Sequence, residues 1–181
     1  VKTLVLDEGD TLIVPEHIQT VADIIKSTMK DRQILVFSAT VTKDLINKMN
    51  EFMDTYETIT VEKDENFSGQ VDHIYFVCEK RDKPFILEKI SRLGDVKARV
   101  FMKDIGDIDY TASKLEFKEI DVAVLHSDTN KSDREKAIKG FRKGLYPMML
   151  STDVAARGLD IAGLTTVVHF DLPRTLEQYT H

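Results

Sequence analysis

The sequence predicts an α/β fold in which parallel sheets are covered by helices. Short apolar runs alternate along the chain with segments whose apolar residues recur at helical spacing. The runs are apolar at consecutive positions, which is typical of strands that are buried on both faces of a parallel sheet. Parallel strands need helical crossovers between them, and right-handed crossovers give a doubly wound arrangement.

The first 62 residues predict three strands and two helices. We expect strands at Val1–Leu6, Ile34–Phe37 and Thr58–Val61. The first helix is expected to begin at Pro15, since proline is tolerated in a first helical turn. The helices carry apolar residues at helical spacing: Ile18, Val21, Ala22, Ile25 and Met29 in the first, and Leu45, Met49, Phe52 and Met53 in the second.

A polar, acidic segment that ends in glycine follows, from Glu62 to Gly69 (EKDENFSG). This composition is typical of a linker. We therefore expect a linker at 63–69 between a first unit at 1–62 and a second unit at 70–181. The chain opens inside an apolar run without methionine and ends without a helix stop signal, so we expect a piece of a longer protein.

Beyond the linker the alternation of strands and helices restarts. Strands are expected at Val71–Val77, Val100–Met102, Val122–Leu125, Met148–Leu150 and Val167–Phe170. Three helices between them carry apolar residues at helical spacing: Ile86, Ile90 and Leu93; Ile108, Ala112 and Leu115; and Ala137, Ile138 and Phe141. Gly94 is expected to close the first helix and Gly144 the third, each as the C′ residue. Ser132 and Glu135 have the spacing of a capping box at the start of the third helix.

The composition excludes several classes of protein. The 181 residues carry 25 basic and 31 acidic side chains, a formal net charge of −6, which argues against a broadly basic nucleic-acid coat. No apolar run approaches the roughly 18 residues that a membrane span needs. The single cysteine, Cys78, excludes an intramolecular disulfide and a multi-cysteine zinc site. Its place in a strand pattern predicts an inert buried thiol.

Small polar or acidic residues follow three of the predicted strands, where ligands bind in open parallel sheets. The first group is acidic, Asp7-Glu8-Gly9-Asp10. A carboxylate at Asp7 is suited to Mg²⁺, and one at Glu8 to accepting a proton from a water that attacks a phosphate. The alternative for this group is an acidic helix-capping turn.

The second group is Ser38-Ala39-Thr40, for which a helix cap at Thr40 or Thr42 is the alternative. The third, Thr152 to Asp160, combines a glycine, which lets the backbone approach a ligand, with an arginine between two aspartates. A structural Arg–Asp pair is its alternative.

A basic segment, Asn130 to Gly144, contains six basic and two acidic residues. Lys131 and Arg134 stand at the start of its helix, where backbone N–H groups also favour phosphate. The alternative is a solvated helix face. His126 closes a strand and is a further candidate, whereas the five histidines show no metal-ligand spacing. The chain contains neither G-x-x-x-x-G-K-[ST] nor G-x-G-x-x-G.

In this order and spacing, V-L-D-E-x-D, S-A-T, S-T-D-V-A-A-R-G-L-D-I and D-L-P-R-T-L-E-Q-Y-T-H resemble the DEAD-box RNA helicases. That family has two RecA-like domains of the P-loop NTPase type, joined by a flexible linker, and binds ATP and RNA across the cleft between them. The resemblance implies that residues 1–62 are the C-terminal part of the first domain and residues 70–181 most of the second.

The resemblance implies catalytic and coupling roles in the first unit. Asp7 would hold Mg²⁺ through water, and Glu8 would be the base that activates the attacking water. Asp10 would link to Ser38 and Thr40, which couple hydrolysis to unwinding. The chain departs from the family at Gly9, where the family has alanine. We expect a modest effect, because that side chain does no chemistry.

In the second unit the resemblance implies ligand contacts. Arg134, Thr152 and Gly158 match RNA-backbone contacts, Asp160 matches a contact to the ATP ribose, and Phe101 falls at the fourth motif. Two departures lie near Arg134: Lys131 stands where the family usually has glutamine, and Ser127 where it usually has glycine.

The expected function is that of an ATP-dependent RNA helicase that unwinds short duplexes or remodels ribonucleoproteins. ATP and Mg²⁺ are the expected cofactors, and single-stranded and duplex RNA the expected partners, with protein partners in ribonucleoproteins, no membrane and a cytoplasmic location. The family's phosphate loop would precede Val1 and its terminal arginines would follow His181, so the 181 residues alone are expected to be inactive. The alternatives are a non-catalytic RNA- or protein-binding module on this fold and a DNA-directed relative.

Overall fold

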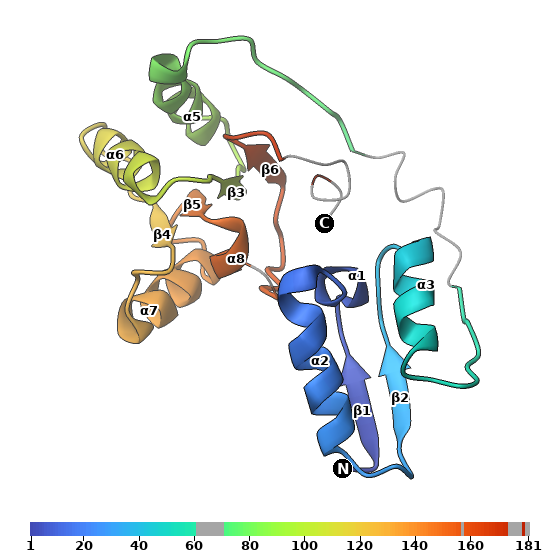
Figure 1. The fold of residues 1–181 in the computed structure, drawn as a ribbon. Coiled ribbons are helices and arrows are strands. Elements are labelled where there is room, and N and C mark those ends of the chain that lie inside the picture. The colour runs from blue at the N-terminus through green and yellow to red at the C-terminus, as the bar shows by residue number, and fades with distance from the viewer. Residues whose placement is uncertain (61–70, 157, 174–178, 180–181) are drawn as a thin grey trace. The chain divides into compact units, whose positions relative to one another are not determined.

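The chain forms two compact units in the computed structural model, which describes residues 1–60, 71–156, 158–173 and 179. One unit takes in Val1–Asp72 and the other His73–Tyr179 (Figure 1). The linker expected at 63–69 lies outside the described residues. No helix in the described ranges is long and apolar enough to cross a membrane.

The first unit contains a two-stranded parallel sheet. Strand β1 (Thr3–Leu6) pairs with β2 (Gln33–Val36) from Thr3↔Gln33 to Leu6↔Val36, so the first two predicted strands are confirmed. The helices are α1 (Gly9–Leu12), α2 (Pro15–Ser27) and α3 (Lys43–Asn50). Pro15 opens α2 as expected, and Thr42 caps α3 by accepting the Leu45 N–H at 3.2 Å.

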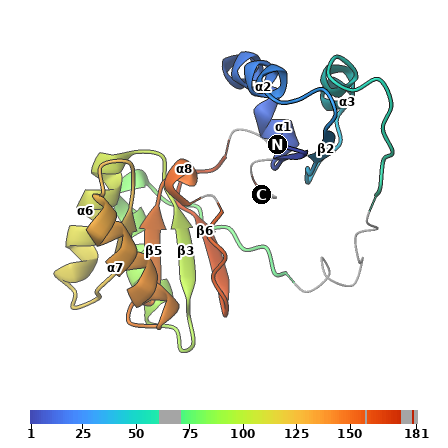
Figure 2. The same cartoon turned by 90° about the horizontal axis from the view of Figure 1, so that it is seen from below.

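The core of this unit lies on one face of the sheet, which α2 and α3 cover (Figure 2). Its buried side chains come from β1, α2 and α3: Leu6, Val21, Ile25, Leu45 and Met49. Val5, whose side chain points to the other face because sides alternate along a strand, is exposed. The third predicted strand, Thr58–Val61, is wrong for residues 58–60, which are exposed and pair with no strand. Their β-branched residues favour extended backbone, but a strand also needs a paired neighbour.

The second unit contains a four-stranded parallel sheet in the order β4-β5-β3-β6. Its strands are β3 (Ala98–Phe101), β4 (Ala123–Leu125), β5 (Met148–Ser151) and β6 (Thr166–His169), close to four of the five predicted ranges. Its helices are the 3₁₀ turn η1 (Lys80–Asp82), α5 (Lys83–Ser91), α6 (Ile105–Glu116), α7 (Lys131–Arg142) and α8 (Asp153–Ala156).

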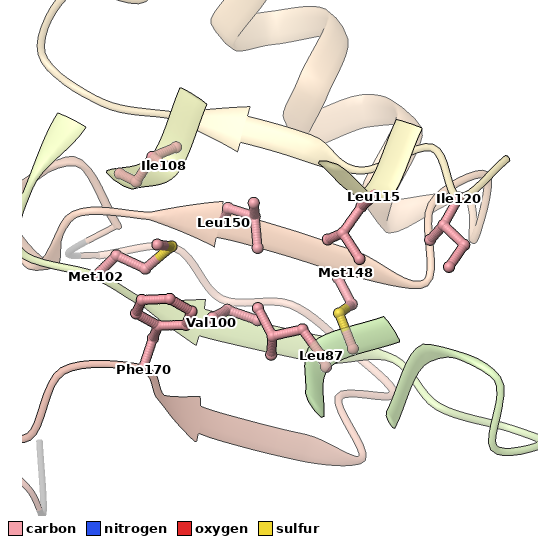
Figure 3. Close-up of a cluster of buried hydrophobic side chains, with 10 residues drawn as sticks. Leu87, Val100, Met102, Ile108, Leu115, Ile120, Met148, Leu150 and Phe170 are labelled. Carbon is pink, nitrogen blue, oxygen red and sulfur yellow. The ribbon is translucent and has the colours of Figure 1, made fainter. Parts of the chain in front are cut away.

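Helices cover both faces of this sheet, as the doubly wound arrangement predicts. On one face α5 and α6 pack through Leu87, Ile108 and Leu115 against the strands (Figure 3). On the other face α7 packs through Phe141. All four residues of β5 are buried, as expected of a central strand covered on both sides.

The strand predicted at Val71–Val77 is wrong. Residues 71–79 form no strand, and the side chains of this range are exposed, Val77 to 92%. An apolar run forms a strand only where a neighbouring strand supplies hydrogen bonds. None of the described strands pairs with residues 71–79. The buried thiol expected at Cys78 is wrong for the same reason, since Cys78 is exposed.

Two helix-end predictions are also wrong. Helix α5 ends at Ser91, and the residue with left-handed backbone nearby is Asp95 (φ 62°) rather than Gly94. Helix α7 is capped by Asn130, whose side chain accepts the Asp133 N–H at 3.0 Å, and not by Ser132 with Glu135. Asparagine is as good an N-cap as serine. With Asn130 in extended backbone (ψ 161°) as the cap, the helix begins at Lys131, before Ser132. Gly144 (φ 76°) closes α7 as expected.

Candidate functional site

The acidic segment after β1 is hydrogen-bonded to the segment after β2. The Gly9 N–H donates to the Phe37 carbonyl at 2.8 Å, and the Asp10 N–H donates to Ser38 Oγ at 3.2 Å. Thr40 Oγ1 donates to Asp10 Oδ2 at 2.6 Å. Because both segments follow parallel paired strands, the sheet places them at the same edge.

Within the segment after β2, Ser38 Oγ also donates to the Thr40 carbonyl at 2.7 Å. The bond from Thr40 Oγ1 to the Asp10 carboxylate is short, and hydrogen bonds to an ionised group are stronger than those between neutral groups. The structure therefore brings together Asp10, Ser38 and Thr40, which the sequence singled out, in one bonded group. These bonds tie Asp10 to the loop that precedes α3.

Asp7 and Glu8 occupy the turn between β1 and α1. Glu8 has left-handed backbone (φ 52°, ψ 49°), and its N–H donates to Asp7 Oδ1 at 2.9 Å. The Asp7 carboxylate is exposed. In the described part of the chain no three His, Cys, Asp or Glu residues gather into a metal-binding group. A single carboxylate such as that of Asp7 is compatible with Mg²⁺, which keeps several waters and uses one or two protein carboxylates.

Gly9 fits closely between β2 and α3. A Cβ built on Gly9 would lie 2.8 Å from Val36 Cγ1 and 3.5 Å from Leu45 Cδ1. The Val36 methyl group sits on a stiff β-branched side chain and cannot swing away easily. The glycine at this position is therefore matched to Val36, and on this geometry we expect its exchange to affect stability more than the lack of side-chain chemistry suggests.

We expect Gly9→Ala to destabilise the protein by about 1–3 kcal/mol, the usual cost of overpacking a filled site. Urea unfolding of the full-length protein measures this loss. Gly94→Ala is the matched control, because a Cβ there would meet no atom within 4 Å. In a Val36→Ala background the penalty should fall. An equal loss of stability from Gly9→Ala with valine or alanine at position 36 would contradict a clash with Val36.

In the second unit Arg134, Thr152 and Gly158 lie near the end of β5. The Thr152 N–H donates to the Leu125 carbonyl at 3.2 Å, and Thr152 Oγ1 accepts the Ala155 N–H at 3.4 Å. Arg134 Nη2 donates to the Ala155 carbonyl at 2.9 Å, which ties α7 to α8. Gly158 (φ 67°) has open space where a Cβ would lie, so the backbone is accessible there.

Asp160 is exposed and is not joined to Arg134 or Thr152 by any hydrogen bond found between the described residues. Its carbonyl accepts from Arg142 Nη2 at 3.1 Å, at the other end of α7. His126, the further candidate, contacts residues of its own unit through both ring nitrogens. Its Nε2 lies 3.5 Å from Asp109 Oδ1, and its Nδ1 accepts the Asp128 N–H at 3.3 Å.

Phe101 stacks on His169, with ring centroids 5.5 Å apart, and Arg99 Cζ lies 4.7 Å from the Phe101 ring centre. Burial lowers the pKa of His169, and the Asp153 carboxylate opposes that shift. Burial also lowers the pKa of Arg99, again against Asp153. The negative charge of Asp153 therefore acts on both the Arg99 guanidinium and the His169 imidazole, and burial outweighs it at each.

Sequence reasoning missed a cluster around Asp171 at the end of β6. Lys83 Nζ donates to the Phe170 carbonyl at 2.6 Å and to Asp171 Oδ1 at 3.3 Å. The Lys103 N–H donates to Asp171 Oδ2 at 3.0 Å, and Lys103 Nζ donates to the Leu172 carbonyl at 2.7 Å. These bonds fix the path of the chain toward Pro173. Only Asp171 carried a signal in the sequence, as part of D-L-P.

Comparisons with known proteins agree with this geometry. Residues 82–181 match the family model described as the helicase conserved C-terminal domain. The chain is 44% identical over 173 residues to a protein of Bacillus subtilis named probable ATP-dependent RNA helicase YfmL. It is 40% identical over 181 residues to the DEAD-box ATP-dependent RNA helicase CshC of Bacillus cereus. The alignments cover 96% and 100% of this chain but 46% of each relative, so the chain spans about half their length.

Solved structures share the fold. Dbp5 of S. cerevisiae, in a structure bound to RNA and ADP BeF3, matches with a TM-score of 0.80 over 98% of this chain and 46% of its own, at 24% identity. A DEAD box protein from the hyperthermophile Methanococcus jannaschii matches with a TM-score of 0.56 and 28% identity, over 100% of this chain and 49% of its own. Both matches agree with the RecA-like fold that the sequence predicted.

Proposed function

This chain belongs to the DEAD-box RNA helicases, and on that premise we propose that the protein it forms part of couples ATP hydrolysis to local RNA strand separation. The observation that carries the proposal is the 2.6 Å bond from Thr40 to Asp10. It joins the acidic segment after β1 (residues 7–10) to the segment after β2 (residues 38–40). A movement of the acidic segment during hydrolysis would therefore move the loop before α3.

In the first unit, we assign Glu8 as the base that takes the proton of the attacking water and orients it. Asp7 would hold Mg²⁺ through the ion's waters. When bound, Mg²⁺ neutralises negative charge on the phosphates. Asp10 is hydrogen-bonded to Ser38 and Thr40, so a change at Asp7 and Glu8 during hydrolysis would reach the loop before α3 through these bonds.

In the second unit, we assign Arg134, Thr152 and Gly158 to the RNA backbone and Asp160 to the ribose of ATP. The support is that Arg134 and Thr152 meet at Ala155 and that the Gly158 backbone is open. Contacts of this kind reach phosphate and sugar, so RNA binding is expected to tolerate sequence and to weaken with salt.

We expect Arg134→Ala to weaken binding of single-stranded RNA by roughly 10-fold to 100-fold, since a hydrogen bond to a charged group contributes about 1.5–3 kcal/mol. The loss should be similar for uridine and mixed-sequence oligomers. The slope of log affinity against log salt should fall by about 0.7, the value for one phosphate contact on a single strand. Fluorescence anisotropy with a non-hydrolysable ATP analogue measures both.

Lys136→Ala is the matched control for Arg134→Ala. Lys136 is an exposed cation on the same helix, 3.3 Å from Asp133, and lies outside the assigned contacts. Its removal should change RNA affinity by less than about twofold, in the range of an exposed ion pair. A loss of affinity that depended on the RNA sequence would count against a backbone contact at Arg134.

The proposal is tested by release of a short strand from an RNA duplex by the full-length protein. Release with ATP and none with ADP is the expected result. RNA binding without release under either nucleotide would favour the alternative, a non-catalytic binding module built on the same fold.

A further inference from the structure

The outer surface of α5 and α6 carries a groove that the assigned ATP and RNA contacts do not use. It has a volume of about 310 Å³ and lies between the two helices, which pack side by side on one face of the four-stranded sheet (Figure 1). Arg134, the assigned RNA contact, belongs to α7 on the opposite face. The groove therefore lies away from the proposed RNA path.

Three aromatic rings line this groove and are exposed: Phe85 to 57%, Tyr110 to 53% and Phe117 to 83%. Between them the groove reaches the buried side chains of Pro84 and Leu115. Exposed aromatic rings beside an apolar floor are typical of protein interaction sites, where one partner's side chain fills the gap.

The charges around the groove are mainly positive, although the whole chain has a net charge of −6. Arg81, Lys114 and Lys118 line it and are exposed. The one carboxylate in the lining, Glu88, has a side chain that is only 15% exposed and lies 3.4 Å from Arg92 Nε. Arg81 Nε is already paired with Glu79 Oε2 at 2.9 Å, so a ligand meets Lys114 and Lys118 as the main cations, beside one largely covered, paired carboxylate.

We propose that this groove docks a short acidic segment of a partner protein, anchored by an apolar or aromatic side chain between α5 and α6. The anchor replaces water over Pro84 and Leu115. Acidic side chains on either side pair with Lys114 and Lys118, and with Arg81 in exchange for Glu79. This is recognition by charge complementarity around a central anchor, the form that peptide-binding grooves commonly take.

Single-stranded RNA fits the same groove less well. Nucleobases bind by stacking on open aromatic faces. Lys89 Nζ lies 4.9 Å from the centre of the Phe85 ring, and Lys114 Nζ lies 5.3 Å from that of Tyr110, so ammonium groups already sit over two of the three rings. Acidic side chains pair with those ammonium groups where they are, whereas stacked bases must displace them.

The test uses a library of 12-residue peptides on phage, selected against the full-length protein. We expect enrichment of peptides that combine Asp or Glu with Phe, Trp or Leu. A labelled synthetic copy of the most enriched peptide should bind the protein and lose at least 10-fold in affinity with Lys114→Glu and Lys118→Glu together. Phe117→Ala should weaken binding as well. These three positions are exposed, so the variants are expected to fold.

The matched control reverses two exposed cations on the other face, Lys136→Glu and Lys139→Glu, and should leave peptide affinity unchanged. A labelled uridine decamer serves as the RNA probe and should bind the groove variants as it binds the parent. No enrichment, or equal peptide binding by the parent and the groove variants, would overturn the proposal. Loss of the decamer in the groove variants would make the groove an RNA site instead. Because peptide affinity does not depend on ATP turnover, this result is separate from the test of the helicase proposal.

Discussion

Glu8→Gln should lower RNA-stimulated ATP hydrolysis by roughly 100-fold to 10,000-fold, the contribution expected of a positioned general base. Glutamine keeps the size of the side chain and loses the ability to accept a proton. Glu8 also has left-handed backbone at a turn fixed by the 2.9 Å bond from its N–H to Asp7, and the substitution preserves that bond. Steady-state phosphate release by the full-length protein measures the effect.

Two observations keep the Glu8→Gln result specific. RNA binding with a non-hydrolysable ATP analogue should be nearly unchanged, because the assigned RNA contacts belong to the second unit. Glu16→Gln, which removes an exposed carboxylate in the first turn of α2, should hydrolyse ATP at the parent rate. Hydrolysis retained in Glu8→Gln would remove the base assignment while leaving the fold and family untouched.

Thr40→Val should uncouple strand separation from hydrolysis. Valine fills the same space as threonine but cannot donate to Asp10 Oδ2, so the 2.6 Å bond is lost. A hydrogen bond to a charged group contributes about 1.5–3 kcal/mol, which corresponds to roughly 10-fold to 100-fold. We expect the number of strands released per ATP hydrolysed to fall by that factor. Parallel strand-release and phosphate-release assays on one preparation give the ratio.

Thr20→Val is the matched control for Thr40→Val. Thr20 is exposed on α2, so the same exchange there removes a hydroxyl outside the bonded group. Its ratio of strands released to ATP hydrolysed should equal that of the parent. If Thr40→Val lowered both activities equally, the Asp10–Thr40 bond would support catalysis rather than coupling.

The sequence predicted most strands of the parallel sheets because each is a short apolar run. Strand β5 is buried at all four positions, as its consecutive apolar residues predict. Strands β1 and β2 were located by the same pattern, although Val5 of β1 is exposed. The same rule misplaced a strand at Val71–Val77, because the rule records apolar side chains and not the partner that a strand needs.

Most hydrogen bonds between segments far apart in the chain could not be predicted from the sequence. The resemblance implied that Asp10 is linked to Thr40, which lies 30 residues away. No pattern connected Lys83 to Asp171, because 88 residues separate them and neither position is unusual in its own segment. The close fit of Gly9 against Val36 is likewise a matter of three-dimensional packing, and spacing along the chain does not record it.

Stimulation of ATP hydrolysis by single-stranded RNA is the measurement that shows whether the protein is an RNA-dependent ATPase. The full-length protein should hydrolyse ATP slowly alone and at least 10-fold faster with saturating RNA, because the proposed mechanism joins the carboxylate cluster of the first unit to RNA contacts in the second. Equal hydrolysis with and without RNA, or no hydrolysis while RNA stays bound, would contradict the account.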